Sequence, residues 1–85
     1  MSTLEKLKVR IKKIPKDFRF EEAKRLLEAL GFEEFNKGKT SGSRVRFYRE
    51  EDNAIIDLHK PHPEPEMRKY ALKQLVEKLK EYGDL

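Results

Sequence analysis

The sequence has no cysteine among its 85 residues. This absence excludes disulfide bonds, thiolate metal sites and thiol nucleophiles. The sequence also lacks an apolar run long enough to span a membrane, and its N-terminus lacks the apolar core of a signal peptide. We therefore expect a cytoplasmic protein that forms one small domain with a modest core.

Acidic residues are missing from two segments that are rich in lysine and arginine. Residues 6–16 contain six basic side chains and residues 37–49 contain five, and neither segment contains an acid. The whole chain has a formal net charge of +4, so the distribution of charge says more than its total. Charged residues make up 42% of the sequence, which is typical of heat-adapted proteins and of idealised designed sequences.

The first third of the chain predicts two helices. Residues 2–14 have apolar side chains at helical spacing, although the stretch from Leu7 to Ile11 also alternates apolar and basic residues as a strand would. Residues 20–30 form a clear amphipathic pattern with acids in the first turn. Gly31 follows the last apolar position, where a left-handed residue commonly ends a helix.

The remainder of the chain predicts three strands and a third helix. The expected strands are residues 32–36, 45–49 and 54–58, and the expected helix is residues 66–82. A turn signal separates the second strand from the third, so these two strands should form a hairpin. Three prolines between Pro61 and Pro65 exclude regular structure there.

The predicted fold class is α+β, with the order α-α-β-β-β-α. We expect a three-stranded antiparallel sheet with helices packed on one face, which leaves the other face free. Residues 1–85 should form a single domain. Within it, residues 1–15 form an N-terminal helix extension and residues 18–82 form an α-β-β-β-α core.

A cationic surface is predicted where the basic segment enters the second strand. Arg44 and Arg46 share one face of that strand with Tyr48, which can stack a base. The loop before them is rich in glycine and hydroxyl groups and offers donors to phosphates. The predicted RNA-binding residues are Lys37, Lys39, Ser43, Arg44, Arg46, Tyr48 and Lys60. The alternative is a solvated strand face that follows a hairpin connection.

The two histidines of the sequence, His59 and His62, are the candidate catalytic residues. Metal-free RNA cleavage needs a base to take the 2′-hydroxyl proton, an acid to protonate the leaving oxygen, and cations to hold the phosphate. Histidine suits both proton roles because its pKa is ordinarily near neutrality. His59 follows a predicted strand, and His62 lies in a loop braced by prolines. The alternative is that both are exposed loop residues without a task.

Two other kinds of site are disfavoured. His59 and His62, even with Asp57 and Glu64 nearby, do not supply four ligands at recognised zinc spacings, so we expect no metal site. The glycine-rich loop does not match a P-loop, because it leads into a strand where a P-loop leads into a helix. We expect no cofactor.

Four segments stand in a characteristic order along the chain. They are Leu26-Leu27-Glu28-Ala29-Leu30-Gly31-Phe32, Lys37-Gly38-Lys39-Thr40-Ser41-Gly42-Ser43-Arg44-Val45-Arg46-Phe47, Ile56-Asp57-Leu58-His59-Lys60 and Ala71-Leu72-Lys73-Gln74-Leu75. With the α-β-β-β-α order, this set resembles the HicA family of toxin mRNA interferases, which have a double-stranded-RNA-binding-like fold. The resemblance covers roughly residues 18–80.

The resemblance implies an mRNA endonuclease of a type II toxin–antitoxin system that acts without a metal and is neutralised by a HicB-type antitoxin. Most members have a histidine just after the Gly-Ser that opens the second strand, and that histidine is taken as catalytic. Here Gly42-Ser43 is followed by Arg44 and Val45. Either His59 or His62 therefore supplies the chemistry, or the chain binds RNA without cutting it.

Three interpretations follow from the sequence. The first is a ribonuclease toxin, the second is a non-catalytic RNA-binding module of the same fold, and the third is a designed or redesigned scaffold without activity. The expected partners are mRNA and an antitoxin protein, with no membrane and no small-molecule cofactor.

Overall fold

The computed structural model describes residues 3–35, 44–61 and 63–85. The elements are α1 (Thr3–Lys12), α2 (Phe20–Ala29), β1 (Glu33–Glu34), β2 (Arg44–Arg49), β3 (Ala54–His59) and α3 (Lys69–Glu81). The strands form an antiparallel sheet in the order β1-β2-β3. The predicted α+β fold, with its α-α-β-β-β-α order, is confirmed.

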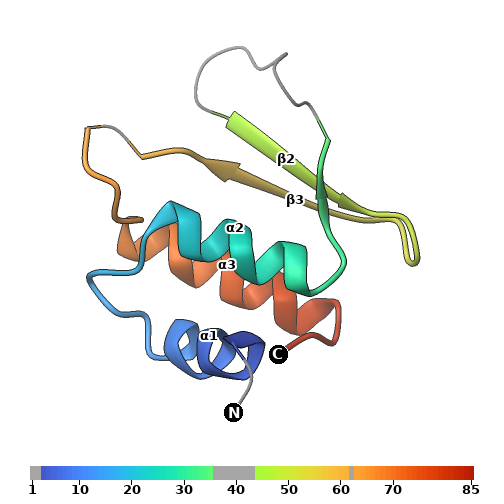
Figure 1. The fold of residues 1–85 in the computed structure, drawn as a ribbon, viewed down its shortest axis with the longest axis horizontal. Coiled ribbons are helices and arrows are strands. Elements are labelled where there is room, and N and C mark those ends of the chain that lie inside the picture. Colours follow the sequence, from blue (N-terminus) through green and yellow to red (C-terminus); the bar gives the residue numbers. More distant parts are fainter. Residues whose placement is uncertain (1–2, 36–43, 62) are drawn as a thin grey trace.

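The helices all lie on one side of the sheet, as Figure 1 shows. α2 and α3 form the layer next to the strands, and α1 lies beyond them, where it contacts both. The segment from Leu7 to Ile11, whose alternation also allowed a strand, is helical, and its two apolar ends are buried. The helix extension therefore adds a third layer and does not touch the sheet face that is free.

The main part of the core lies between the sheet and the helices, where α2, α3 and the β2–β3 hairpin each contribute one apolar face. Their buried residues are Phe20, Ala23, Leu26 and Leu27 of α2, Leu72, Leu75, Val76 and Leu79 of α3, and Val45, Phe47, Ala54, Ile56 and Leu58 of the hairpin. Burying one large aliphatic or aromatic side chain stabilises a fold by about 1.5–3 kcal/mol. Because strand residues alternate between faces, this core also decides which residues of β2 and β3 point to solvent.

α3 begins three residues later than its apolar spacing predicts. Glu66 forms an isolated β-bridge with Arg19. On either side of this bridge, the Phe20 N–H donates to the Pro65 carbonyl at 3.0 Å, and the Met67 N–H donates to the Phe18 carbonyl at 2.7 Å. These long-range hydrogen bonds hold the segment extended, so the helix starts only at Lys69.

Two other boundaries also differ from the prediction. α1 ends at Lys12, because a residue before proline, here Ile14, is disfavoured in the helical region. Ile14 itself has φ 49°. β1 is limited to Glu33–Glu34, although the Phe35 N–H still donates to the Arg46 carbonyl at 2.7 Å. Gly31 has φ 97°, which confirms it as the left-handed residue after α2.

Arg49, at the end of β2, is a buried charge whose donors are well satisfied. Its guanidinium donates to both carboxylate oxygens of Asp52 (2.9 and 2.7 Å) and of Asp84 (both 2.9 Å), and to the Leu30 carbonyl at 3.1 Å. The guanidinium carbon of Arg49 lies 4.5 Å from the centre of the Phe32 ring. These contacts tie the hairpin, the end of α2 and the C-terminal segment together.

Candidate nucleic-acid interface

The face of the sheet opposite the helices carries the outward side chains of the β2–β3 hairpin. The outward residues are Arg44, Arg46 and Tyr48 on β2 and Ile55, Asp57 and His59 on β3. They form three cross-strand pairs, which are Arg44–His59, Arg46–Asp57 and Tyr48–Ile55. The predicted sharing of one face by Arg44, Arg46 and Tyr48 is confirmed.

These three pairs are the non-hydrogen-bonded pairs of the ladder. Arg46 directs its carbonyl toward β1, where it accepts from Phe35, and Ile55 directs its main chain toward the Tyr82 hydroxyl. Both observations place the alternate residues, such as Phe47 and Ile56, in the hydrogen-bonded positions. Side chains are closest in non-hydrogen-bonded pairs, where Cβ atoms lie about 4.5–5.5 Å apart.

The middle pair is already an ion pair. Arg46 donates to the two carboxylate oxygens of Asp57 at 2.8 and 3.2 Å. The Arg46 guanidinium lowers the pKa of Asp57 from its ordinary value, and the charges of Arg44 and His59 act in the same direction. Asp57 therefore stays ionised at neutral pH and does not act as a proton donor. Arg46 in turn has fewer free donors for a phosphate than its place in the sequence indicates.

The pair at the end of the hairpin is open. His59 is the last residue of β3 and lies opposite Arg44, the first residue of β2. Both residues are exposed, and neither forms an ion pair with any residue that the structure describes. The sequence predicted that His59 follows the strand, whereas it belongs to β3, so the hydrogen-bonded hairpin holds its backbone more firmly than a loop would. The register therefore brings together an imidazole and a guanidinium that are both accessible.

Tyr48 is less free to stack a base than its position indicates. It is half-buried, and its hydroxyl donates to the Asn53 side-chain oxygen at 2.8 Å. The Phe35 ring meets it edge to face, with 6.2 Å between ring centres. Phe35 itself is 61% exposed, so it is the aromatic ring of this pair that solvent reaches more easily.

Several predicted site residues lie outside the described residues. They are Lys37, Lys39, Ser43 and His62. Lys60 is described, and it is exposed directly after His59. The predicted roles of these residues therefore remain predictions.

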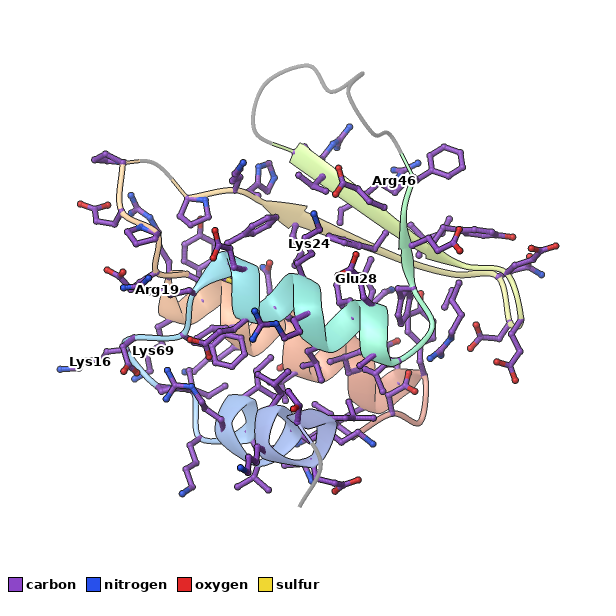
Figure 2. The ribbon with its side chains drawn as sticks, in the orientation of Figure 1. Lys16, Arg19, Lys24, Glu28, Arg46 and Lys69 are labelled. Atoms are coloured by element: carbon purple, nitrogen blue, oxygen red, sulfur yellow. The ribbon has the colours of Figure 1, made fainter. Side chains whose placement is uncertain are left out.

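A second group of cations lies at the end of the helical layer where α2 and α3 begin. Lys16, Arg68, Lys69 and Lys73 line a hollow of about 700 Å³ together with Tyr70. Figure 2 shows Lys16 and Lys69 at this end of the helices, whereas Arg46 lies over the sheet. This group was not predicted. Its sequence signal is the start of α3, whose first turn contains no acid.

The two cationic regions adjoin. A smaller hollow of about 270 Å³ is lined by His59 and Lys60 on one side and by Arg68 and Tyr70 on the other. Since Arg68 and Tyr70 also line the larger hollow, the cations continue from the end of the hairpin to the start of α3. His59 lies within this path, beside Lys60, which follows β3, and Arg68, which precedes α3.

The structure also bears on metal and membrane sites. Among the described residues, no group of three or more histidine, cysteine, aspartate or glutamate side chains is placed to hold a metal ion. In the same part of the chain, no helix combines the length and apolar character that a membrane span requires.

The fold and the basic surface define a small α+β protein with an exposed cationic hairpin end. A family model described as HicA toxin of bacterial toxin-antitoxin matches residues 20–83. The chain therefore belongs to the HicA toxin family, and α1 lies outside the matched range. No curated protein and no solved structure matches the chain.

Proposed function

We propose that this protein is a toxin that binds mRNA in the cytoplasm and cleaves it without a metal ion, and that a HicB-type antitoxin neutralises it. The single observation that carries the proposal is the exposed Arg44–His59 pair, with further cations adjoining it. A polyanion held on these cations would have its ribose and phosphate beside an imidazole.

The chemistry assigns one proton transfer to His59. The imidazole either takes the proton of a 2′-hydroxyl, whose oxygen then attacks the adjacent phosphorus, or protonates the 5′-oxygen that leaves. The guanidinium of Arg44 stabilises the charge that builds up on the phosphate oxygens. Asp57 stays paired with Arg46, which leaves the other proton transfer to His62 or to solvent.

The test is cleavage of an end-labelled RNA by the purified protein in EDTA. We expect fragments that end in 2′,3′-cyclic phosphate, and resistance when the 2′-hydroxyl at the cleaved position is replaced by hydrogen. His59→Ala should lower the rate by about 100-fold or more, the usual contribution of a general acid or base. Lys80→Ala, an exposed position of α3 outside the proposed site, is prepared in the same way and controls for a contaminating nuclease. His62→Ala tells whether His62 or solvent makes the other proton transfer.

A second function keeps the binding and omits the cleavage. It is favoured by Arg44, which stands where most HicA members have the histidine taken as catalytic. Intact RNA at high protein concentration, with salt-dependent binding, would support this binding module and contradict the nuclease. Absence of both activities at low salt would contradict both functions and leave an inactive scaffold.

A further inference from the structure

The outer edge of β3 is closed at one end and open at the other. The Tyr82 hydroxyl accepts a hydrogen bond from the Ile55 N–H at 3.2 Å and donates one to the Ile55 carbonyl at 3.0 Å. Since main-chain directions alternate along a strand, Asp57 and His59 also direct their N–H and C=O groups outward. Among the described residues, no side chain meets those groups as Tyr82 meets Ile55.

A groove runs beside this edge, between β3 and α3. Its volume is about 450 Å³, and its α3 side includes Tyr70, Ala71, Gln74, Leu75 and Lys78. Leu75 is buried and Ala71 is half-buried, so the base of the groove is apolar. Tyr70 is 62% exposed, which is high for a large apolar ring. An open strand edge beside an apolar channel is the usual setting for strand addition.

The groove is positively charged at both ends. Lys78 lies at the closed end, where its ammonium is 5.4 Å from the centre of the Tyr82 ring. Lys60 and Arg68 line the hollow that continues the groove past His59. The acid of the groove, Asp57, is compensated by Arg46. A second copy of the chain would bring the same cations to the edge, so charge favours a different, acidic partner.

We propose that the open edge of β3 binds an extended, acidic segment of a partner protein as an additional strand. Its main chain would pair with the outward groups of Asp57 and His59. Alternate side chains would be apolar toward α3, and acidic residues near the ends would meet Lys78 and Lys60. The inference goes beyond RNA cleavage, and its test contains no RNA, so either can fail without the other.

The probe is a library of random twelve-residue peptides displayed on phage and selected against the immobilised full-length protein. We expect selected peptides to alternate apolar and acidic residues. In the complex with a selected peptide, the amide protons of Asp57 and His59 should exchange with solvent about tenfold more slowly or better, because they become hydrogen-bonded.

Two pairs of variants separate the edge from its surroundings. Asp57→Pro removes the outward N–H, whereas Asp57→Asn removes the same carboxylate and keeps the N–H, so only Asp57→Pro should weaken selected peptides by about tenfold or more. Lys78→Glu should weaken them by a similar factor. Lys80→Glu, an exposed lysine of the same helix outside the groove, should not.

Several results would overturn the proposal. One is a failure to enrich any peptide, and another is protection of amides elsewhere in the chain. A third is equal binding to Asp57→Pro and Asp57→Asn, with circular dichroism showing that both are folded. Should Asp57→Pro fail to fold, the exchange of the Asp57 and His59 amides in the native sequence decides alone. Sedimentation showing self-association that Lys78→Glu strengthens would assign the edge to a second copy and also overturn it.

Discussion

Arg44 and Arg49 stand at the two ends of β2, but their surroundings are opposite. Arg44 points to solvent beside His59 and forms no ion pair with a described residue. Arg49 points into the protein, is 7% exposed, and donates to two carboxylates and a carbonyl. An odd number of positions separates them, so the pleat places them on different faces.

The difference shows how one residue type serves both structure and recognition within a single strand. A buried guanidinium is tolerated only when its donors are satisfied, and here that satisfaction links three distant segments. An exposed guanidinium without a partner retains its donors for an anion. Arg46 is the intermediate case, because it faces solvent but is held by Asp57.

The largest effect on stability should come from substitution of Arg49, which points into the protein at the end of β2. Arg49→Met leaves the carboxylates of Asp52 and Asp84 without their partner, and we expect a loss of about 2–4 kcal/mol in the free energy of unfolding. Arg44→Met is the matched control and should change it by less than about 0.5 kcal/mol. Urea unfolding followed by circular dichroism measures both. Equal losses would show that the buried Arg49 contributes no more to the free energy of unfolding than the exposed Arg44.

The next largest effect on stability should come from two glycines, each of which is next in sequence to a hydrogen-bond partner of Arg49. Gly31 (φ 97°) follows Leu30, and Gly83 (φ 82°) precedes Asp84. Substituting either with alanine should cost about 1–2 kcal/mol, since a left-handed backbone disfavours a Cβ.

A Cβ at Gly31 would lie 3.4 Å from the nearest Arg49 carbon, an ordinary contact, and a Cβ at Gly83 would meet nothing within 4 Å. The two losses, measured by urea unfolding, should therefore be similar. A much larger loss at Gly31 would mean that the Arg49 side chain cannot yield, and that crowding rather than backbone conformation dominates there.

Substitution of Arg44, which points to solvent at the start of β2, should have a smaller effect than these, and it should appear in RNA binding. Arg44→Met should weaken RNA affinity several-fold and lower the slope of log affinity against log salt by about one unit, as expected for the loss of one phosphate contact. Lys12→Met removes an equal charge from the exposed end of α1 and is the control. Filter-binding titrations between low and moderate salt give both quantities. Identical behaviour of the two variants would place the RNA contact elsewhere.

The smallest effect is the acid dependence of the Arg46–Asp57 pair. The pKa of Asp57 in the folded protein lies below its ordinary value of 3.8, mainly because Arg46 hydrogen-bonds to the ionised form. The unfolded chain therefore binds more protons in this range, so the stabilisation is present above about pH 4 and is lost as pH falls through the folded pKa.

Its size should be below about 1 kcal/mol, because the pair is largely open to solvent. The difference in unfolding free energy between the native protein and Asp57→Asn, measured from pH 7 to pH 2, isolates it. The difference should be constant above pH 5 and shrink below pH 4. A difference that grows on acidification would contradict the assigned pairing.

The sequence was sufficient for the element order and for the outward face of β2, because both follow from local spacing. The stripe from Phe20 to Leu27 and the alternation of Arg44 with Val45 need only a period of 3.6 or of 2. The start of α3 was mispredicted, since the apolar spacing contains no sign of the bridge between Arg19 and Glu66.

The candidate site was predictable in residue type and only partly in arrangement. The sequence predicts that Arg44 and Arg46 are equally available to bind RNA. The strand register, however, pairs Arg46 with Asp57 and Arg44 with His59. The cations at the start of α3 were missed because Lys16 and Lys69, which are far apart in the sequence, line the same hollow only after the chain has folded.

By itself, the sequence determined the α+β order, the basic character of the chain and the absence of thiol chemistry, because each depends on neighbours in the chain or on composition. Only the tertiary structure decided which charges are paired and which are free. Arg49 meets Asp84 across 35 positions, and the open edge of β3 exists because Tyr82 reaches Ile55 but not the residues beyond it. Coulombic and hydrogen-bonding partners depend on distance in space, and the register of a sheet decides that distance.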